Sequence, residues 1–469
     1  MDAAPQSSLA ATPPAAGAGH GKRWPRRVAL AVAAVLVAAL AALALAISTY
    51  DWNRARGWLA QHVSEAIGRR VEIRGDLALT WVRAGPGESG IARWIPWPQL
   101  DAHDVAVGNP DWVDTPDMLA ARHLRVRMRV LPLLNRSLSF DSIEIDGLDA
   151  GLVLDAQNRN NWTFTPRPRE DGAAPWQVDI RRLRLEHARL TLADAPDKLD
   201  LEVLAASLDE PPYGLGFSIR GKYRGKPVTG RGRAGSLLAL REGGQAYPLD
   251  IALDSGPIHV ALTGTLTDPR APPVFDMKLD LAMHSMADLY PLTGVALPDT
   301  PPFKTSGRLY GGREHGTGRV TYENFTGRAG ASDLSGTLAF QLTRPRPKLS
   351  GSLHSKLLRL ADLAPSVGAP ASPAAPAAKS GRVLPSERFR VERLDAMDAD
   401  VEFSAGQIVK SAGVPMDSVH TRIALADSVL TLDPLKFGLA GGSVNGSVVM
   451  DSRAADLKTR LRASLDQLQ

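Results

Sequence analysis

The stretch Arg125-Val126-Arg127-Met128-Arg129-Val130 alternates strictly between charged and apolar side chains. Successive side chains of a β-strand point to opposite faces of a sheet, so a period of two predicts a strand with one polar and one apolar face. Ser142-Ile143-Glu144-Ile145-Asp146 repeats the pattern, and a further alternating strand follows Gly147. These stretches predict an antiparallel sheet with one apolar face.

The same period extends beyond a Pro-rich stretch at 166–175. The apolar members of the alternation are expected to share one face of the sheet. These candidate inward-facing residues are Val126, Met128, Val130, Ile143, Ile145, Leu152, Leu154, Leu183, Leu185, Leu190 and Leu192. The predicted fold class is therefore mostly β.

An internal repeat organises the second half of the chain. Each copy has a glycine that we interpret as a turn residue, an alternating strand, a return strand and an Asp-Leu exit. The copies begin at Gly264-Thr265-Leu266, Gly336-Thr337-Leu338 and Gly446-Ser447-Val448, and they end at Ala287-Asp288-Leu289, Leu360-Ala361-Asp362-Leu363 and Leu465-Asp466-Gln467-Leu468. Such units bury an apolar face only by stacking on their neighbours, which predicts a long repetitive sheet.

The expected length of this sheet restricts its shape. If about 25 to 30 strands lie side by side at ~4.8 Å, the sheet is about 120 to 145 Å long. An open twisted sheet of more than ~10 strands curls or splits. Curling with the apolar side chains inward gives a groove lined by Leu, Val and Ile, whereas splitting gives several small sandwiches with closed cores. The periodicity fits both shapes.

A membrane anchor is predicted near the N-terminus. Residues 28–47 contain no polar side chain, and four basic residues lie between Lys22 and Arg27. A helix of this length spans about 30 Å, the thickness of the hydrocarbon core of a bilayer. The basic cluster predicts a cytoplasmic N-terminus, with everything after Tyr50 across the membrane. The anchor residues include Val28, Leu36, Leu40, Leu43 and Ile47.

A cleaved signal peptide is the alternative to this anchor, since Ala44 and Ala46 form an Ala-x-Ala site. The apolar run is longer than the ~7 to 15 residues expected of a signal peptide, so we favour an uncleaved anchor. The absence of cysteine suits a bacterial periplasmic location for the rest of the chain.

The domain organisation follows from these segments. Apolar residues from Trp52 to Ile67 recur at helical spacing, and Gly68 supplies a C-cap, which predicts a short amphipathic helix just outside the bilayer. The predicted parts are a disordered cytoplasmic tail at 1–23, the transmembrane anchor at 24–48, a helix-then-sheet module at 50–165, a β-repeat groove at 176–363, an Ala/Pro-rich linker or loop at 364–384 and a further β-repeat at 385–469. We expect the chain to be a fragment or to need a partner at Gln469, because an uncapped sheet edge invites pairing.

Composition and missing motifs exclude several functions. The chain has no cysteine, which excludes disulfide frameworks, thiolate catalysis, zinc knuckles and iron–sulfur clusters. A formal net charge of +5 over 469 residues is too weak to indicate a nucleic-acid-binding protein. Zinc-helix, phosphate-loop and nucleophile-elbow motifs are missing from the sequence. We therefore expect a protein that is not an enzyme and uses no metal or cofactor.

Two short motifs have a functional and a structural interpretation. Residues 230–235 match the dinucleotide fingerprint, but antiparallel strands rather than a βαβ unit flank them, so a turn is favoured. Asp101, His103 and Asp104 lie close in sequence, and a solvated strand face is favoured over a site.

The basic stripe of Arg125, Arg127 and Arg129 is a third such signal. Its functional interpretation is an anchor for lipid phosphates or an anionic envelope polymer. Its structural interpretation is an edge strand protected by charge. We favour the edge strand.

The order of several short motifs resembles the AsmA-like family of Gram-negative envelope proteins. These motifs are Trp58-Leu59-Ala60, Gly68-Arg69, Gly75-Asp76-Leu77, Leu131-Pro132-Leu133-Leu134, Ile143-Glu144-Ile145-Asp146-Gly147, Asn160-Asn161-Trp162-Thr163-Phe164, Tyr247-Pro248-Leu249-Asp250, Gly264-Thr265-Leu266 and Gly441-Gly442-Ser443-Val444-Asn445-Gly446-Ser447. The resemblance implies an inner-membrane protein with a long periplasmic β-groove, related to bridge-like lipid-transfer proteins and connected with outer-membrane assembly or phospholipid traffic. It implies no catalytic residue.

Two hypotheses follow for the function. The first is a lipid conduit, in which phospholipid acyl chains lie on the apolar groove and the partners are membrane lipids. The second is a structural or assembly factor for outer-membrane proteins, which acts through protein contacts and has closed cores. If the groove is open, Leu185→Asp and Ile145→Asp should leave the fold largely intact, because the carboxylate meets water.

Overall fold

The computed structural model describes most of the chain after residue 50. The described ranges are 51–83, 93–164, 177–242, 245–268, 274–290, 299–314, 317–363, 397–409, 416–439, 441–453 and 457–466, with the single residues Ala34, Val35, Ala38, Ala42, Tyr50 and Gly85. Contacts divide the chain into two units, Met1–Trp52 and Asn53–Gln469.

The first unit contains the predicted transmembrane segment, residues 28–47. Almost all of this segment lies outside the described residues, and so do the predicted anchor residues and the tail at 1–23. Within the described part of the chain, no helix combines the length and the hydropathy that a membrane span requires. The anchor therefore stays a prediction.

The second unit begins with the expected short helix. The helix α2 (Arg56–Ile67) ends at Gly68, whose φ of 71° is left-handed and whose N–H donates to Ser64 O over 2.9 Å. This is the glycine C-cap that the sequence predicts. Val71 N donates to Ser64 Oγ over 2.8 Å, which ties the first strand to the helix.

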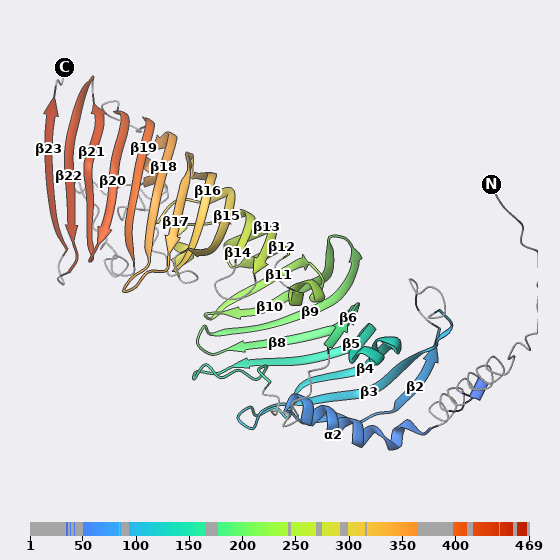
Figure 1. Cartoon of the computed structure of the whole chain (residues 1–469). Coiled ribbons are helices and arrows are strands. Elements are labelled where there is room, and N and C mark those ends of the chain that lie inside the picture. Colours follow the sequence, from blue (N-terminus) through green and yellow to red (C-terminus); the bar gives the residue numbers. More distant parts are fainter. Residues whose placement is uncertain are drawn as a thin grey trace, which may run out of the picture. The chain divides into compact units, whose positions relative to one another are not determined.

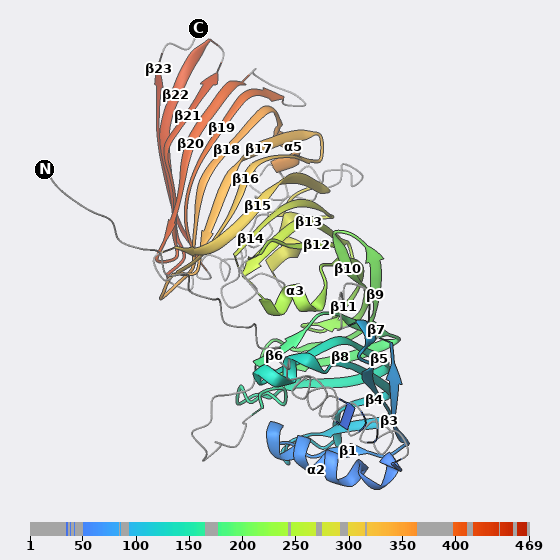
Figure 2. The same cartoon turned by 45° about the vertical axis from the view of Figure 1, so that its right-hand side comes forward.

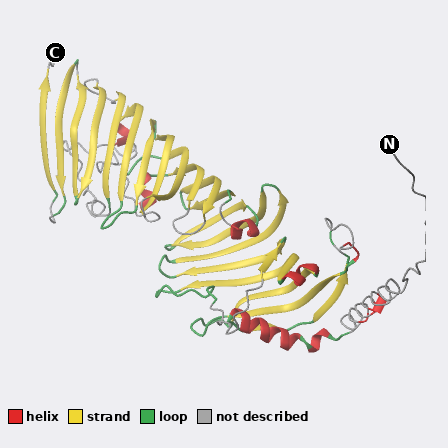
Figure 3. Ribbon diagram, in the orientation of Figure 1, coloured by secondary structure: helices red, strands yellow, loops and turns green. Residues whose placement is uncertain are grey.

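The strands form one 23-stranded sheet (Figures 1 and 3). They are β1 (Val71–Ile73), β2 (Leu77–Val82), β3 (Trp97–Gly108), β4 (Asp117–Arg129), β5 (Ser137–Leu154), β6 (Gln177–Ile180), β7 (Leu183–Glu186), β8 (Ala188–Asp194), β9 (Leu199–Glu210), β10 (Tyr213–Tyr223), β11 (Lys226–Ala234), β12 (Tyr247–Ser255), β13 (Ile258–Asp268), β14 (Val274–Met283), β15 (Phe303–Glu314), β16 (Thr317–Ala329), β17 (Ser332–Gln341), β18 (Lys348–Arg359), β19 (Asp398–Val409), β20 (Met416–Ala426), β21 (Val429–Leu439), β22 (Gly442–Asp451) and β23 (Lys458–Asp466). The short helices are η1 (Trp52–Arg54), η3 (Leu131–Asn135), α3 (Leu237–Glu242), η4 (Met286–Leu289) and α5 (Leu360–Leu363).

The sheet is mixed, so the prediction of a purely antiparallel sheet is wrong at two places. β5 pairs in parallel with β6, β7 and β8 in turn, and β18 pairs in parallel with β19. A parallel pair needs a crossover connection of about a dozen residues or more. The two connections contain the Pro-rich stretch at 166–175 and the predicted linker at 364–384, both outside the described residues.

The described part of the sheet is open at both ends. Within the described ranges, β1 and β2 pair only with β3, and β23 pairs only with β22. Figure 2 shows the strands from β14 to β23 following one another in chain order. The predicted mostly β fold is therefore confirmed as a long open sheet with few helices.

The repeat glycines lie inside strands, which corrects their interpretation as turn residues. Gly264 is within β13, Gly336 within β17 and Gly446 within β22. A Cβ at Gly264 would overlap the backbone carbonyl oxygen of Asp276 on the neighbouring strand. Glycine at such a position permits a close approach of two backbones and a local bend of the sheet.

A change in the phase of alternation keeps the apolar side chains of β5 on one face. Gly147 does not separate two strands, because β5 is continuous and Gly147 lies within it with a φ of 64°. Ile143 and Ile145 before it occupy odd positions, and Leu148, Ala150, Leu152 and Leu154 after it occupy even positions. Asp104 in β3 and His187 between β7 and β8 have φ values of 50° and 49°, so left-handed residues occur at two further places in this part of the sheet. Such bulge-like residues redirect the side chains that follow them.

Candidate functional site

One row of apolar residues crosses the sheet from β1 to β17. It takes one residue from each of fourteen strands, each paired directly with the next, and only Thr305 is polar. The row is Val71, Val107, Leu119, Ala150, Leu190, Val203, Ile219, Gly230, Leu253, Val260, Leu281, Thr305, Gly327 and Leu334. Directly paired residues share a face, so these residues form a continuous apolar track.

A second row continues the track to the end of the sheet. It runs through every strand from β10 to β23 and crosses the parallel pair of β18 and β19. The row is Leu215, Ala234, Leu249, Gly264, Met277, Leu309, Tyr322, Leu338, Gly351, Val401, Ile423, Leu432, Val448 and Leu461. Leu249 and Leu253 lie four residues apart on β12, so both rows share one face, which we call the apolar face.

Ten of the eleven predicted inward-facing residues lie on β4, β5, β7 and β8, and several form direct pairs, whereas Val130 lies just after β4, at the start of η3. Ile143 pairs with both Val126 and Leu183, Ile145 pairs with Leu185, and Leu152 pairs with Leu192. The eleven predicted residues do not include the row members on β9 to β17, such as Val203 and Ile219. The alternation in residues 199–204 and 217–223 is the signal that could have found them.

Most large side chains of the apolar face are half-buried. Ten of the eleven predicted residues are half-buried, and only Leu185, at 8% exposure, is buried. Side chains in a closed two-layer core are mostly fully buried. A compact core occurs where η4 packs against the ends of strands. It consists of Ile258, Met283 and Phe303 with Val260, Leu281, Met286, Leu289, Ala329 and Leu334.

Paired charges cover the opposite, polar face. Arg125 donates from Nε to Asp101 Oδ1 over 2.9 Å and from Nη1 to Glu144 Oε2 over 3.1 Å. Burial raises the pKa of the Asp101 carboxyl, but hydrogen bonds from Gln99, Arg125 and His123 outweigh it, and this pKa lies below its usual value. The charges of this face are therefore neutralised across neighbouring strands.

This pairing corrects the interpretation of the basic stripe as an edge strand. β4 carries Arg125, Arg127 and Arg129 and pairs with β3 on one side and β5 on the other, so it is internal. Arg127 donates to Gln99 Oε1 over 3.1 Å, and the Arg129 guanidinium lies 5.9 Å from the Trp97 ring centroid.

The other two weak motifs lie in strands of the sheet, the first in β11 and the second in β3. Residues 230–234 belong to β11, an antiparallel strand, so both the nucleotide loop and the turn are wrong. His103 stacks on His123 with ring centroids 4.6 Å apart. In the described ranges, no group of three or more His, Asp or Glu side chains could hold a metal ion.

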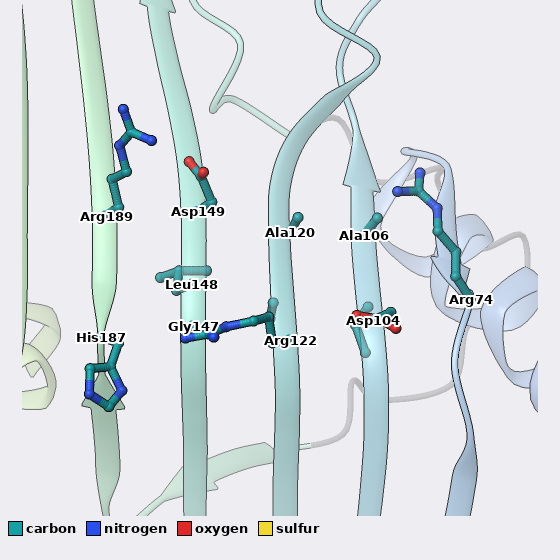
Figure 4. Close-up of a pocket in the computed structure, with 12 residues that line it drawn as sticks. Arg74, Asp104, Ala106, Ala120, Arg122, Gly147, Leu148, Asp149, His187 and Arg189 are labelled. Atoms are coloured by element: carbon teal, nitrogen blue, oxygen red, sulfur yellow. The ribbon is translucent and has the colours of Figure 1, made fainter.

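A pocket of about 340 Å³ opens on the polar face (Figure 4). Ala106 and Ala120 form part of its lining, with Arg122, Asp149 and Arg189 projecting beside them. Arg189 is paired with Glu202 over 2.8 Å. The pocket lies on the face opposite the apolar track, because these residues alternate with Val107, Leu119 and Ala150.

Two of the short motifs, Gly68-Arg69 and Asn160-Asn161-Trp162-Thr163-Phe164, are joined by hydrogen bonds at the start of the sheet. Asn161 is fully buried, and its side chain accepts from Val153 N over 2.9 Å and donates to Gly151 O over 2.7 Å and to Asn109 Oδ1 over 2.8 Å. Arg69 Nη2 donates to Asn161 O over 3.2 Å. The residues after α2 therefore hold the segment that leaves β5.

The fold and the site define a long, open, mixed sheet with one continuous apolar face and one charge-paired face. The sequence matches the AsmA family over residues 24–235 and 216–469, so the chain belongs to the AsmA family. Members of this family are bacterial envelope proteins, and membership suggests a part in envelope or outer-membrane biogenesis.

Two proteins of Escherichia coli K12 are similar to this chain. AsmA family protein YhjG is 33% identical over 472 residues, which cover 92% of this chain and 69% of YhjG. Protein AsmA is 21% identical over 453 residues, which cover 93% of this chain and 64% of AsmA. The chain thus spans about two thirds of the length of these relatives. No solved structure matches it.

Proposed function

We propose that this protein is a non-enzymatic, inner-membrane-anchored periplasmic protein that guides phospholipid along its apolar face. The observation that carries the proposal is the unbroken apolar track, whose large side chains are half-buried. Residues 28–47 would serve as the anchor. The assembly-factor alternative expects closed cores, and the open, half-buried face weighs against it.

The energetics suit movement along the track. Removing one CH₂ group from water is worth ~0.8 kcal/mol, so an acyl chain on this face could gain on the order of 10 kcal/mol before ordering costs. Neighbouring strands present similar aliphatic side chains at a spacing of ~4.8 Å. An acyl chain that moves by one strand exchanges one set of aliphatic contacts for another, so no position holds it tightly.

The test compares two variants of one strand. Each adds a single carboxylate, one on the apolar face and the other on the polar face. Ile219 is a half-buried member of the first row on β10, and the adjacent Ser218 is exposed on the polar face. Ile219→Asp should abolish lipid transfer between vesicles, because moving acyl chains would meet a carboxylate. Ser218→Asp adds the same charge to the same strand and should transfer lipid as the unmodified chain does.

Two further measurements make the test decisive. Bound phospholipid, measured by mass spectrometry of the purified chain, should persist in Ile219→Asp, because the other strands still offer the apolar face. Protease resistance of both variants reports the fold. Equal transfer by the two folded variants, or purified chain without phospholipid, would contradict the conduit.

A further inference from the structure

Exposed apolar side chains gather at one edge of the sheet, at the ends of β2 to β6. Trp94 is 86% exposed in the turn before β3, and Leu131 and Leu134 are 43% and 82% exposed in η3. Val178, the second residue of β6, is 46% exposed. We call these four residues the tryptophan–leucine edge. A large indole with almost no cover is uncommon on a soluble surface and marks an interaction site.

The strand pairing shows that these residues share an edge. β3 begins where β4 ends, because Gln99 pairs with Arg127. The helix η3 joins β4 to β5, and the start of β6 lies beside the start of β5, with Leu138 paired to Val178. Five neighbouring strands at ~4.8 Å span about 20 Å, so the four side chains lie within that distance along the edge.

Arginines surround this edge. The described residues 81–83, 93–99, 127–141 and 177–182 contain seven arginines and two carboxylates. The arginines are Arg83, Arg93, Arg127, Arg129, Arg136, Arg181 and Arg182, and the carboxylates are Asp141 and Asp179. Arg182 donates to Asp141 over 2.8 Å, and this carboxylate is only 6% exposed. The seven arginines and two carboxylates give these ranges together a formal charge of +5.

We propose that the tryptophan–leucine edge docks on the surface of an anionic phospholipid bilayer. Trp and Leu side chains enter the boundary between head groups and acyl chains, while arginines meet lipid phosphates. Each arginine near an anionic surface contributes about 1 kcal/mol. Docking would orient this end of the sheet against the membrane. It does not depend on lipid transport along the apolar face.

The absence of native cysteine allows a direct test in the full chain. Leu134→Cys carries an environment-sensitive fluorophore, and the chain is reconstituted into vesicles of phosphatidylcholine, with or without phosphatidylglycerol. The expected result is a blue shift and quenching by a bilayer-embedded nitroxide, in the phosphatidylglycerol vesicles only. Leu465→Cys, 57% exposed on β23, is the matched control and should show neither.

Charge variants test whether the arginines of the tryptophan–leucine edge recognise anionic lipid. Arg93→Gln and Arg181→Gln should each lower the docked-to-free ratio about fivefold, the factor that corresponds to about 1 kcal/mol. Arg231→Gln, an exposed arginine on β11, should not change it. Two results would overturn the proposal and favour a protein partner at this edge. One is no fluorescence shift of the label at residue 134 with phosphatidylglycerol, and the other is a fluorescence shift that neither edge variant changes. Neither outcome bears on the Ile219→Asp transfer test.

Discussion

The side chain of Arg122 lies across the backbone of Gly147, in the space that a Cβ at residue 147 would occupy (Figure 4). Gly147 has a φ of 64°, in the left-handed region. This conformation changes the phase of alternation, so Ile145 and Leu148 can project to the same face of β5. The contact between Arg122 and Gly147 therefore lies where β5 is irregular. The apolar track continues across this point.

Gly147→Ala should lower the free energy of unfolding by about 1–2 kcal/mol, the cost of a left-handed L-residue. The Arg122 side chain is flexible and can move aside, so we expect little additional cost. Gly225→Ala is the control, since Gly225 has a φ of 77° and nothing within 4 Å of its Cβ position. Similar losses in chemical denaturation are expected. A much larger loss for Gly147→Ala would mean that Arg122 is held rigidly.

Much of this sheet could be predicted from local pattern. A period of two identifies strands and their faces without knowledge of neighbours, so the pattern alone predicts that Ile143 and Leu183 share a face. Gly68 is predictable as a C-cap because helices commonly end at a left-handed residue, which is usually glycine. These inferences depend only on residues near in sequence.

Features set by distant strands could not be predicted. The parallel pairing of β18 with β19 joins residues fifty positions apart, such as Gly351 and Val401, and no local signal specifies it. Local sequence favours a turn at Gly264, because glycine is common in turns. Its actual environment is the backbone of the neighbouring strand, which depends on register. The half-burial of the apolar face also depends on what covers it.

Gly264→Ala should destabilise the sheet more than an ordinary strand substitution. The added methyl group would overlap the carbonyl oxygen of Asp276, and a backbone atom cannot move aside as a side chain does. We expect a loss of about 1–3 kcal/mol in chemical denaturation. Gly312→Ala on β15 is the control, because its nearest neighbours are Val274 methyl groups at 3.6 and 3.8 Å. This control should be neutral or slightly stabilising. Equal effects would argue against close backbone approach at Gly264.

Asn161→Ala should loosen the segment that follows β5. The substitution leaves the Val153 N–H and the Gly151 carbonyl without the partners that the buried amide supplies. Unsatisfied buried groups cost about 1–3 kcal/mol each, so a total loss of about 2–5 kcal/mol is expected. Limited proteolysis should cut earlier within residues 155–164. Asn135→Ala, an exposed asparagine at the end of η3, should leave the cleavage pattern unchanged.

The Asp333 carboxylate should make stability depend on acid pH. Burial raises the pKa of Asp333, but hydrogen bonds from the backbone N–H groups of Lys356 and Leu357 outweigh it, so the pKa lies below its usual value. A depressed pKa stabilises the fold above the unfolded-state value of ~4, and this contribution is lost as the pH falls through the lower folded-state value.

Asp333→Asn tests this dependence. Its amide has one acceptor oxygen for the two N–H groups, so the variant should be less stable than the unmodified chain at pH 7. The difference should shrink as the pH is lowered below about 4. Asp111→Asn, at an exposed position before β4, is the control and should leave stability at pH 7 unchanged. A constant difference between Asp333→Asn and the unmodified chain from pH 7 to pH 2 would show that the carboxylate does not titrate as proposed.

Leu185 and Ile145 should respond differently to the same charge, although they are direct partners across β5 and β7. Leu185 is 8% exposed, and its N–H donates to Ser207 Oγ over 2.9 Å, so the residue is held between β5 and β9. Leu185→Asp buries an uncompensated carboxylate and should cost about 3–5 kcal/mol. Ile145 is half-buried, so an aspartate there can reach water and should cost about 1–3 kcal/mol.

Urea denaturation and protease resistance of the two variants measure this difference. The expectation that both substitutions leave the fold intact needs revision at Leu185, and only Ile145→Asp reports on the openness of the face. Ile145→Asn and Leu185→Asn are the controls for side-chain volume. Asparagine has nearly the shape of aspartate but carries no charge. The excess cost of Asp over Asn should be large at Leu185 and small at Ile145. A large excess cost of Asp over Asn at Ile145 would mean that this side chain does not reach water. The interpretation of the apolar face as open would then be wrong at β5.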